Sequence, residues 1–420
     1  MKRYFYLKNP WWENKKIHVK SGIGRPAYLN QLRKDFPQNL IQIVTGLRRV
    51  GKSTLVLQLI KYLIKKKEIN PKHILLFSIE EPSLANFLIS EIINEFRTIN
   101  NLDSSEKIYV FIDEIQFRAG WEREIKSLYD SENIKFVLTG SSAMLLSENL
   151  AFLTGRYLKT TVYPLSFKEF LKFKKIKVKP VDSFLLNRHV INFFQIGGMP
   201  EFVLNQPDRY LETTIESILF KDLVSKFRVR NPQILGDLIY LLSDRVGSTS
   251  SSLKLSNIIE INKDSISTYL SYLEQTFIIC QLNNFSTSRN KQIYNPPKIY
   301  FTDTGTANTY ASKTNFGALA ENAIFNHLKK KTANQLHTQL GYWHEDKQEI
   351  DFVIKKKNQL TLIESKWVDK VEEINFKPLQ KVLHDFSPKR VIYVTKTLRG
   401  KVEINKQPVE LIPLAEFLLK

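Results

Sequence analysis

Short apolar runs alternate with helical patterns over the first third of the chain. The apolar runs cover residues 40–44, 74–79, 108–112 and 134–138. Nearly every position in them is apolar, which is typical of strands that are covered on both faces. Segments with helical periodicity, such as 53–67 and 121–130, separate these runs. The alternation predicts a parallel sheet with helices on both sides, and therefore an α/β fold.

Changes of pattern farther along the chain predict its domain boundaries. Residues 1–38 mix basic and aromatic positions with Gly and Pro breakers, as expected of a lead-in segment that packs on the α/β core. A helical pattern comes after the core, then a second compact helical pattern that ends in an apolar run, and a new α/β pattern begins near residue 316. We therefore predict four regions, which comprise residues 1–180, 181–235, 236–315 and 316–420.

The composition is that of a globular protein with an excess of positive charge. Lys and Arg number 62 against 42 Asp and Glu, a formal net charge of +20. This excess favours a polyanionic partner such as nucleic acid, although a genome biased toward Lys, Asn and Ile codons would also produce it. Cys280 is the single cysteine, and no apolar run approaches the ~20 residues of a membrane helix. With no signal-peptide pattern at the N-terminus, we expect a cytoplasmic protein without membrane association.

A phosphate-binding sequence comes directly after the first predicted strand. Residues 46–53 match the pattern GxxxxGK followed by Ser or Thr, and they lie between a strand and a helix as this motif requires. The glycines let backbone N–H groups turn toward phosphates, and the helix N-terminus adds positive potential. Lys52 is expected to reach the β- and γ-phosphates, and the Ser53 hydroxyl to bind Mg²⁺. The predicted nucleotide-binding residues are Gly46, Arg49, Val50, Gly51, Lys52, Ser53 and Thr54.

Acidic and polar residues end the third and fourth apolar runs. Asp113 can hold Mg²⁺ directly or through water, and Glu114 can orient and deprotonate an attacking water. Thr139 and Ser141 come at the end of the next strand and are candidates for sensing the γ-phosphate, with a plain Thr-Gly turn as the alternative. These residues predict ATP and Mg²⁺ as cofactors, with Glu114, Lys52 and Thr139 as catalytic residues.

The motifs of residues 40–170 resemble those of the AAA+ ATPases of archaea and bacteria, in particular the branch related to origin-binding and signalling NTPases. The segments that carry the resemblance are TGLRRVGKST, VFIDEIQ, LTGSS, LTGR and YPLSFKEF. The resemblance implies a sheet of order 5-1-4-3-2 and ATP bound between subunits of a homo-oligomeric ring, for example a hexamer. It implies a helical lid over 181–235, whose turn would be Gly197-Gly198-Met199-Pro200. It also implies a catalytic arginine at Arg156 that meets phosphate in cis or from a neighbouring subunit; a structural salt bridge is the open alternative.

A helix–turn–helix pattern lies in the third predicted region. Two helical segments, 255–262 and 263–274, have the required spacing and apolar faces, and the apolar strands after them suit a winged helix. The outer side of the second helix would carry the predicted DNA-binding residues, which are Lys263, Ser265, Ser267 and Thr268. A helical pair used only for packing or oligomerisation is the alternative, since winged helices often serve that purpose.

Four polar residues of the last region form a possible second active site. If the segments around 350–353 and 362–366 pair as a symmetric hairpin, Asp351 faces Glu364, and their carboxylates could share one Mg²⁺. Lys366 points to the same face as Glu364 and could stabilise the charge of a scissile phosphate. Glu321 lies on the apolar stripe of a helix over 318–331, where a carboxylate requires a partner such as a metal.

This set resembles the PD-(D/E)xK nuclease superfamily, with Glu321, Asp351 and Glu364 as metal ligands and Lys366 as the motif lysine. The residues around Asp303, Glu321, Asp351 and Glu364 are also similar to the C-terminal domain of unknown function that is often fused to this ATPase class. In that family a winged helix precedes a restriction-endonuclease-like α/β fold, which here corresponds to residues 236–315 and 316–420. A salt-bridged hairpin in a nuclease-like fold without cleavage is the alternative.

The sequence therefore leaves two functions open. The first is a DNA-acting ATPase, a ring-forming motor or clamp that binds DNA, branched DNA included, with a metal-dependent nuclease or a relic of one. The second is a signalling-type NTPase whose C-terminal domains recruit a protein partner and do not cut DNA. A passive DNA reader is disfavoured, because it would need no water-activating acid beside Asp113.

Overall fold

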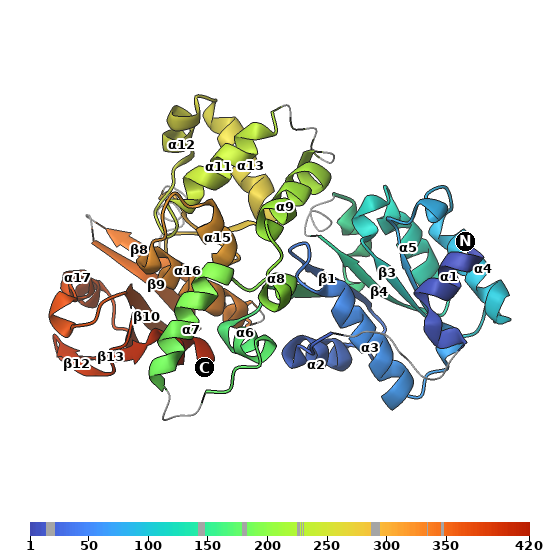
Figure 1. Cartoon of the computed structure of the whole chain (residues 1–420), viewed down its shortest axis with the longest axis horizontal. Helices are drawn as coiled ribbons and strands as arrows, with labels where there is room; N and C mark the ends of the chain where they lie inside the picture. Colours follow the sequence, from blue (N-terminus) through green and yellow to red (C-terminus); the bar gives the residue numbers. More distant parts are fainter. Residues whose placement is uncertain are drawn as a thin grey trace. The chain divides into compact units, whose positions relative to one another are not determined.

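The computed structural model describes residues 1–13, 22–141, 148–178, 183–224, 227, 229, 231–286, 295–333, 335–345 and 348–420. The chain divides into two units, Met1–Tyr163 and Pro164–Lys420, each of which is described by itself (Figure 1). The predicted boundary between residues 180 and 181 falls outside the described residues, and the boundaries at 235 and 315 stay predictions. In the described part of the chain, no helix combines the length and the apolar character needed to cross a membrane.

The first unit is built on a five-stranded sheet, and every neighbouring pair of its strands is parallel. The strand order is β2-β3-β4-β1-β5, which confirms the predicted order 5-1-4-3-2. Helices α2 and α3 lie on one side of this sheet and α5 on the other (Figure 1). The elements are α1 (Lys2–Lys8), α2 (Pro26–Asp35), β1 (Ile41–Gly46), α3 (Lys52–Lys66), β2 (Ile74–Ser78), α4 (Ile89–Asn100), β3 (Ile108–Asp113), α5 (Trp121–Ser131), β4 (Ile134–Gly140) and β5 (Tyr157–Val162), with 3-10 turns at Pro10–Trp12, Pro71–His73, Pro82–Leu84, Ile115–Phe117 and Glu148–Leu153.

The N-terminal lead-in packs on the exposed edge of strand β2. The Asn9 side chain accepts from the backbone N–H of Leu76 at 2.6 Å and donates to the carbonyl of the same residue at 3.0 Å. Trp12 donates its indole N–H to the carbonyl of Ile74 at 2.8 Å. Side chains thus take the place of a sixth strand, which satisfies backbone groups that an open sheet edge leaves unpaired.

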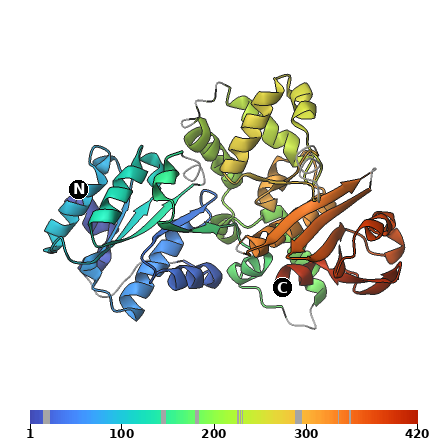
Figure 2. The ribbon, with the colours of Figure 1, turned by 180° about the vertical axis from the view of Figure 1, so that it is seen from behind.

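The second unit contains a helical part, a two-stranded antiparallel sheet and a six-stranded mixed sheet. The six strands have the order β12-β13-β11-β10-β9-β8, and Figure 2 shows this sheet from the opposite side in orange to red. The elements are α6 (Phe167–Phe173), α7 (Ser183–Ile196), α8 (Pro200–Asn205), α9 (Tyr210–Ser217), a π-helical segment (Ile218–Val224), α11 (Gln233–Ser243), α12 (Ser252–Ile259), α13 (Lys263–Gln275), β6 (Ile279–Leu282), β7 (Lys298–Phe301), α15 (Thr304–Tyr310), α16 (Phe316–Thr332), β8 (Thr338–Glu345), β9 (Gln348–Lys356), β10 (Gln359–Lys366), a 3-10 turn (Val371–Glu373), α17 (Lys377–Asp385), β11 (Arg390–Thr395), β12 (Gly400–Ile404), β13 (Gln407–Pro413) and α18 (Leu414–Leu419).

Strands β9 and β10 form the hairpin that the sequence predicted, in the predicted register. Leu362 pairs with Val353, and Ile363 pairs with Phe352. All four side chains are buried. Past these two pairs of residues, a side chain connects the strands: the Glu364 carboxylate accepts from the backbone N–H of Asp351 at 3.0 Å.

The double-glycine turn before α8 packs against the N-terminus of α15. The Asp303 carboxylate caps α15 by accepting from the backbone N–H of Thr306 at 2.8 Å, and it also accepts from the N–H of Gly198 at 2.5 Å. A Cβ on Gly197 would lie 2.4 Å from an Asp303 carboxylate oxygen, and one on Gly198 would lie 2.4 Å from the carbonyl oxygen of Leu165. Neither turn position therefore has room for a side chain.

The close approach at Gly198 predicts a large effect for a small substitution. Gly198→Ala is expected to lower the free energy of unfolding by about 1–3 kcal/mol, because the added methyl group meets backbone atoms that cannot move independently. Gly236→Ala in α11 is the matched control, since a Cβ there would meet no atom within 4 Å. That change should instead stabilise the helix by up to about 1 kcal/mol. Urea denaturation of both variants checks this, and equal effects would contradict the packing described.

Candidate functional site

The phosphate-binding loop joins the C-terminal end of β1 to the N-terminus of α3. Gly46 has φ +146°, and a Cβ at this position would lie 2.2 Å from the carbonyl oxygen of Val162 on β5. Gly51 has φ +97° and forms the N-cap of α3. The two glycines of the motif are therefore required by the backbone path and by the approach of a neighbouring strand. The loop delivers the N-terminus of a 15-residue helix to the end of the sheet.

Lys52 and Ser53 open α3 and have different environments. Lys52 is 4% exposed, and its ammonium group donates to the carbonyl oxygens of Gly46 and Leu47, each at 3.1 Å. Ser53 is exposed. Arg25 also contacts the loop and donates to the carbonyl of Val50 at 3.2 Å. Lys52 thus closes the loop and lies at its mouth, where phosphates would meet it.

The predicted magnesium ligands contact each other. The Ser53 hydroxyl lies 2.9 and 3.1 Å from the two carboxylate oxygens of Asp113 and donates to that carboxylate. Thr139 donates its hydroxyl to the same carboxylate and accepts from the backbone N–H of Glu114 at 3.2 Å. A hydroxyl and a carboxylate oxygen are the donors that Mg²⁺ takes in P-loop proteins. Three predicted site residues from three elements therefore meet at the C-terminal edge of the sheet.

Glu114 is held by a residue that the sequence analysis missed. Gln116 donates its side-chain N–H to the Glu114 carboxylate at 2.5 Å, and its amide oxygen accepts from the backbone N–H of Ser141 at 3.3 Å. The Ser141 hydroxyl is buried and has no hydrogen-bond partner within the described residues. The sensing role of Ser141 stays a prediction. Ser142 lies outside the described residues.

A cavity of about 210 Å³ opens beside the predicted magnesium ligands. Its lining includes Ser53 and Asp113 from the site, Leu76 from β2, and Lys8 and Trp11 from the lead-in segment. The lead-in therefore lies next to Ser53 and Asp113. The glycine cradle and the paired Ser53 and Asp113 fit phosphate groups with Mg²⁺.

Arg156 lies at the opposite edge of the same sheet. Its carbonyl oxygen accepts from the N–H of Ile41, the first residue of β1, whereas the phosphate-binding loop begins at the last residue of that strand. Strand β1 has six residues, and at about 3.3 Å per residue it separates the two ends by more than an arginine side chain can span. The Arg156 guanidinium instead pairs with Asp130 at 3.1 Å. Arg156 therefore does not reach the phosphate-binding loop of its own chain, which corrects the predicted cis role. The salt bridge with Asp130 is the contact that is observed.

In the second unit, two of the predicted nuclease residues, Glu321 and Asp351, contact a buried lysine. Lys298, at the start of β7, is 1% exposed. Its ammonium group lies 3.0 Å from Glu321 of α16, 2.7 Å from Glu349 of β9 and 2.9 Å from Asp351 of β9. Burial by itself lowers the pKa of Lys298, but the charges of Asp351, Glu321 and Glu349 outweigh burial and raise the pKa well above its ordinary value. Lys298 is therefore a charged group.

Glu364 belongs to a separate contact. Its carboxylate accepts from Lys366 at 2.6 Å and from the Asp351 N–H at 3.0 Å. Burial, reinforced by the charge of Asp351, raises the pKa of Glu364, as burial also raises that of Glu321. Within the described ranges, no three His, Cys, Asp or Glu side chains are grouped so that they could hold a metal ion. The three predicted metal ligands therefore do not share one contact, because Glu321 and Asp351 contact Lys298 whereas Glu364 contacts Lys366.

The predicted DNA-binding residues lie on α13, which comes after α12 in a helix–turn–helix arrangement and precedes the antiparallel pair β6 and β7. Lys263, Ser267 and Thr268 are exposed, and Ser265 is partly buried. Ser267 and Thr268 donate their hydroxyls to carbonyl oxygens of their own helix, at 3.1 and 2.8 Å. Residues 236–315 contain seven Lys and Arg against six Asp and Glu. The positive excess of the chain is therefore not concentrated here.

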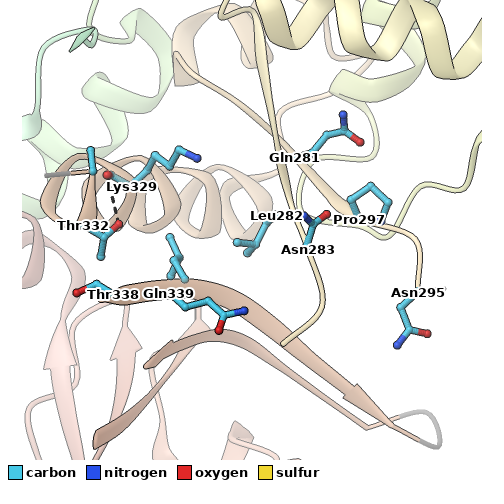
Figure 3. A pocket seen from close by; sticks show the side chains of 11 residues that line it. Gln281, Leu282, Asn283, Asn295, Pro297, Lys329, Thr332, Thr338 and Gln339 are labelled. Atoms are coloured by element: carbon cyan, nitrogen blue, oxygen red, sulfur yellow. Dashed lines mark hydrogen bonds between the residues drawn. The ribbon is translucent and has the colours of Figure 1, made fainter. Parts of the chain in front are cut away.

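A polar cavity of about 700 Å³ lies beside the antiparallel pair (Figure 3). Gln281, Asn283 and Pro297 line it from one side, and Lys329 of α16 and Gln339 of β8 line it from the other. None of the predicted nuclease or DNA-binding residues is among the residues that line it. It is therefore separate from the Lys298 cluster.

Comparisons with known proteins agree with the geometry of the first unit. Residues 38–171 match the family described as AAA domain. Residues 187–316 match a domain of unknown function (DUF8612), and residues 316–417 match a second domain of unknown function (DUF4143). The chain thus carries an AAA-type P-loop ATPase domain followed by two domains of unknown function.

Relatives span most of the chain. An uncharacterized protein of Haemophilus influenzae is 29% identical over 418 residues, which are 96% of this chain and 100% of the relative. An uncharacterized protein of Methanocaldococcus jannaschii is 29% identical over 335 residues, 76% of this chain and 73% of the relative. A Walker-type ATPase of Pyrococcus abyssi has a TM-score of 0.42 at 17% identity and covers 70% of this chain and 97% of its own. AMPPCP-bound DnaA from Aquifex aeolicus has a TM-score of 0.29 at 15% identity, over 62% of this chain and 93% of its own.

Proposed function

We propose that this protein is a magnesium-dependent ATPase that acts on DNA. The observation that carries the ATPase mechanism is the contact of Ser53 and Thr139 with the Asp113 carboxylate at the mouth of the phosphate-binding loop. In this proposal the loop N–H groups and Lys52 bind the phosphates, and Ser53 and Asp113 hold Mg²⁺. When bound, the metal ion neutralises charge on the phosphate oxygens.

Glu114 is the proposed general base. Gln116 donates to one of its carboxylate oxygens, which leaves the other as the proton acceptor for an attacking water. Thr139 connects the two acids, because it donates to Asp113 and accepts from the N–H of Glu114. One hydroxyl group thus connects the proposed metal ligand with the backbone of the proposed base.

The DNA part of the proposal is supported by charge and by the helix pair. Residues 1–180 contain 31 Lys and Arg against 17 Asp and Glu, so most of the positive excess lies in the predicted ATPase region. Lys263 and Thr268 are exposed on the second helix of the pair, where a recognition helix would present them. We further propose a cytoplasmic, ring-forming homo-oligomer in which Arg156 serves a neighbouring subunit. In that state its ion pair with Asp130 has to open.

A signalling-type switch with a protein partner is the second candidate. Leu253 and Ile258 on α12 are 58% and 49% exposed, which favours a protein contact over a phosphate backbone. The near balance of charge in residues 236–315 points the same way. In this case hydrolysis should be slow and indifferent to DNA.

ATP turnover in the presence of different nucleic acids separates the two candidates. We expect DNA to stimulate the turnover of the full chain, measured with no DNA, single strands, duplex and four-way junctions. Lys52→Ala should abolish turnover under every condition, which shows that the signal belongs to this site. An ATP turnover rate that is the same without DNA and with each of the three DNAs would overturn the DNA-acting function and favour the switch. The ATPase assignment is tested separately, by the loss of turnover in Lys52→Ala.

A further inference from the structure

We propose that the Lys298 ammonium group is a built-in replacement for a divalent cation, and that the nuclease-like constellation is a structural clamp that binds no metal. This inference goes beyond the ATPase function and does not depend on it. The residues present do not fit the metal that a PD-(D/E)xK site requires. The disagreement is visible in the number of donors, in the hydrogen bonds that the carboxylates already accept and in the positive charge that already lies among them.

The donors of Lys298 match the carboxylates around it. A lysine ammonium has three N–H donors and no acceptor. Three carboxylates surround it at 2.7, 2.9 and 3.0 Å, namely Glu349, Asp351 and Glu321. Glu349 and Asp351 are two residues apart on β9, so their side chains share one face of the strand. Glu321 comes from α16, and the lysine therefore connects three separate elements with its full set of donors.

The carboxylate oxygens that face Lys298 already accept hydrogen bonds. One Asp351 oxygen accepts from Lys298, and the other accepts from the backbone N–H of Ser365 at 2.9 Å. The Glu321 oxygen that faces Lys298 also accepts from the Tyr300 hydroxyl at 2.6 Å. A magnesium ion demands ligand oxygens at about 2.0–2.1 Å in octahedral geometry. It could reach these oxygens only if the ammonium group left.

Two lysines lie among the four carboxylates of the cluster. Lys298 lies among Glu321, Glu349 and Asp351, and Lys366 pairs with Glu364 at 2.6 Å. A divalent ion placed beside Lys298 would meet a buried positive charge within a few ångströms, where repulsion is poorly screened. A buried carboxylate that stays ionised needs a paired charge or a metal ion. Lys298 supplies that charge from within the chain.

The clamp has a definite structural role. Lys298 is the first residue of β7, which belongs to the segment that matches one domain of unknown function. Glu321, Glu349 and Asp351 belong to the segment that matches the next. Gly247 makes room for the arrangement, since a Cβ there would lie 2.7 Å from a Glu321 carboxylate oxygen. The ammonium group therefore joins the two matched segments at the point where a nuclease would bind its metal.

Manganese binding to the full chain tests this inference. All variants carry Asp113→Asn, which removes the carboxylate of the ATP site, and bound Mn²⁺ is counted by electron paramagnetic resonance without nucleotide. With Lys298 present, we expect that Asp351→Asn leaves the number of bound Mn²⁺ ions unchanged. Lys298→Ala should gain one Mn²⁺ ion per chain, and Lys298→Ala with Asp351→Asn should lose it again.

Two outcomes would overturn the clamp. One is a Mn²⁺ ion that binds the chain with Lys298 in place and disappears in Asp351→Asn. The other is a folded Lys298→Ala variant that gains no Mn²⁺.

If the Lys298→Ala variant unfolds, a DNA-cleavage assay on the chain with Lys298 unaltered tests the same inference. Cleavage of labelled DNA with Mg²⁺ or Mn²⁺ that disappears in Asp351→Ala and Lys366→Ala would establish the predicted nuclease and refute the clamp, whereas uncut DNA supports it. ATP turnover, measured separately with Asp113 intact, tests the ATPase function alone.

Discussion

Replacing Glu114 by Gln is expected to lower kcat for ATP hydrolysis by about 10²–10⁴-fold, the contribution typical of a positioned general base. Gln has the same shape as Glu and keeps a partner for Gln116, which contacts the Glu114 carboxylate at 2.5 Å in the native protein. The backbone N–H that Thr139 accepts is unchanged by the substitution. The loss should therefore be confined to the proton-accepting step. Steady-state turnover and equilibrium ATP binding measure the two properties separately.

The control for this experiment is Lys52→Ala, which should lose ATP binding together with turnover. Lys52 donates to Gly46 and Leu47 and would also meet the phosphates, so its removal affects both the loop and the ligand. Glu114→Gln should instead bind ATP with an affinity close to that of the native chain. A Glu114→Gln variant that turns over ATP at the native rate would remove Glu114 from its proposed role, and Gln116 would then need another explanation.

Lys298→Met is expected to lower the free energy of unfolding of the second unit by about 3–5 kcal/mol, the range observed when one partner of a buried ion pair is removed. Met retains the length of the apolar stem but leaves Glu321, Glu349 and Asp351 without their shared cation. Lys401 on β12 is exposed and provides the matched control, and Lys401→Met should change stability by less than about 0.5 kcal/mol. Urea denaturation, followed by a probe in the second unit, measures both.

The penalty of Lys298→Met should also depend on pH. Removing the ammonium group raises the pKa values of the buried carboxylates in the folded state, because burial disfavours their charged form. A carboxylate whose pKa is raised on folding favours the folded state below its unfolded pKa, and that contribution is lost as the pH rises through the folded value. The variant should therefore be closer to the native protein at pH 5 than at pH 8. A penalty that is the same at both pH values would mean that the carboxylates find other partners.

Local features of the fold could be read from the sequence with good accuracy. The phosphate-binding loop is a contiguous segment whose glycines are required by their own backbone angles, so its position was predictable from the sequence. The β9–β10 hairpin was also predicted in its correct register, because a short turn and a period of two determine which residues face each other. The order of the five parallel strands was implied by a family resemblance carried by five short motifs.

Contacts between distant segments were not predictable in this way. Gln116 is the last residue of the recognised segment VFIDEIQ, but only the fold shows that it holds Glu114 and meets Ser141. Arg156 was assigned to the phosphates from its neighbours in sequence, but the parallel pairing of β5 with β1 places it at the other edge of the sheet. No local pattern in the sequence shows which of these residues lie close together. The pairing of strands that are separated by crossover connections depends on the packing of the whole sheet.

The Lys298 cluster is the clearest case of this division. The sequence by itself determined an ATP site with its loop, its two acids and its polar strand ends, since each of these is a local pattern with local chemistry. It also identified Glu321, Asp351, Glu364 and Lys366 as a set of unusual polar residues. Only the tertiary structure decided what neutralises them, because Lys298 is 23 residues from Glu321 and 53 from Asp351 along the chain and reaches both through the packing of β7. The stability of a buried charge depends on the groups that surround it, and those groups come together only in the folded protein.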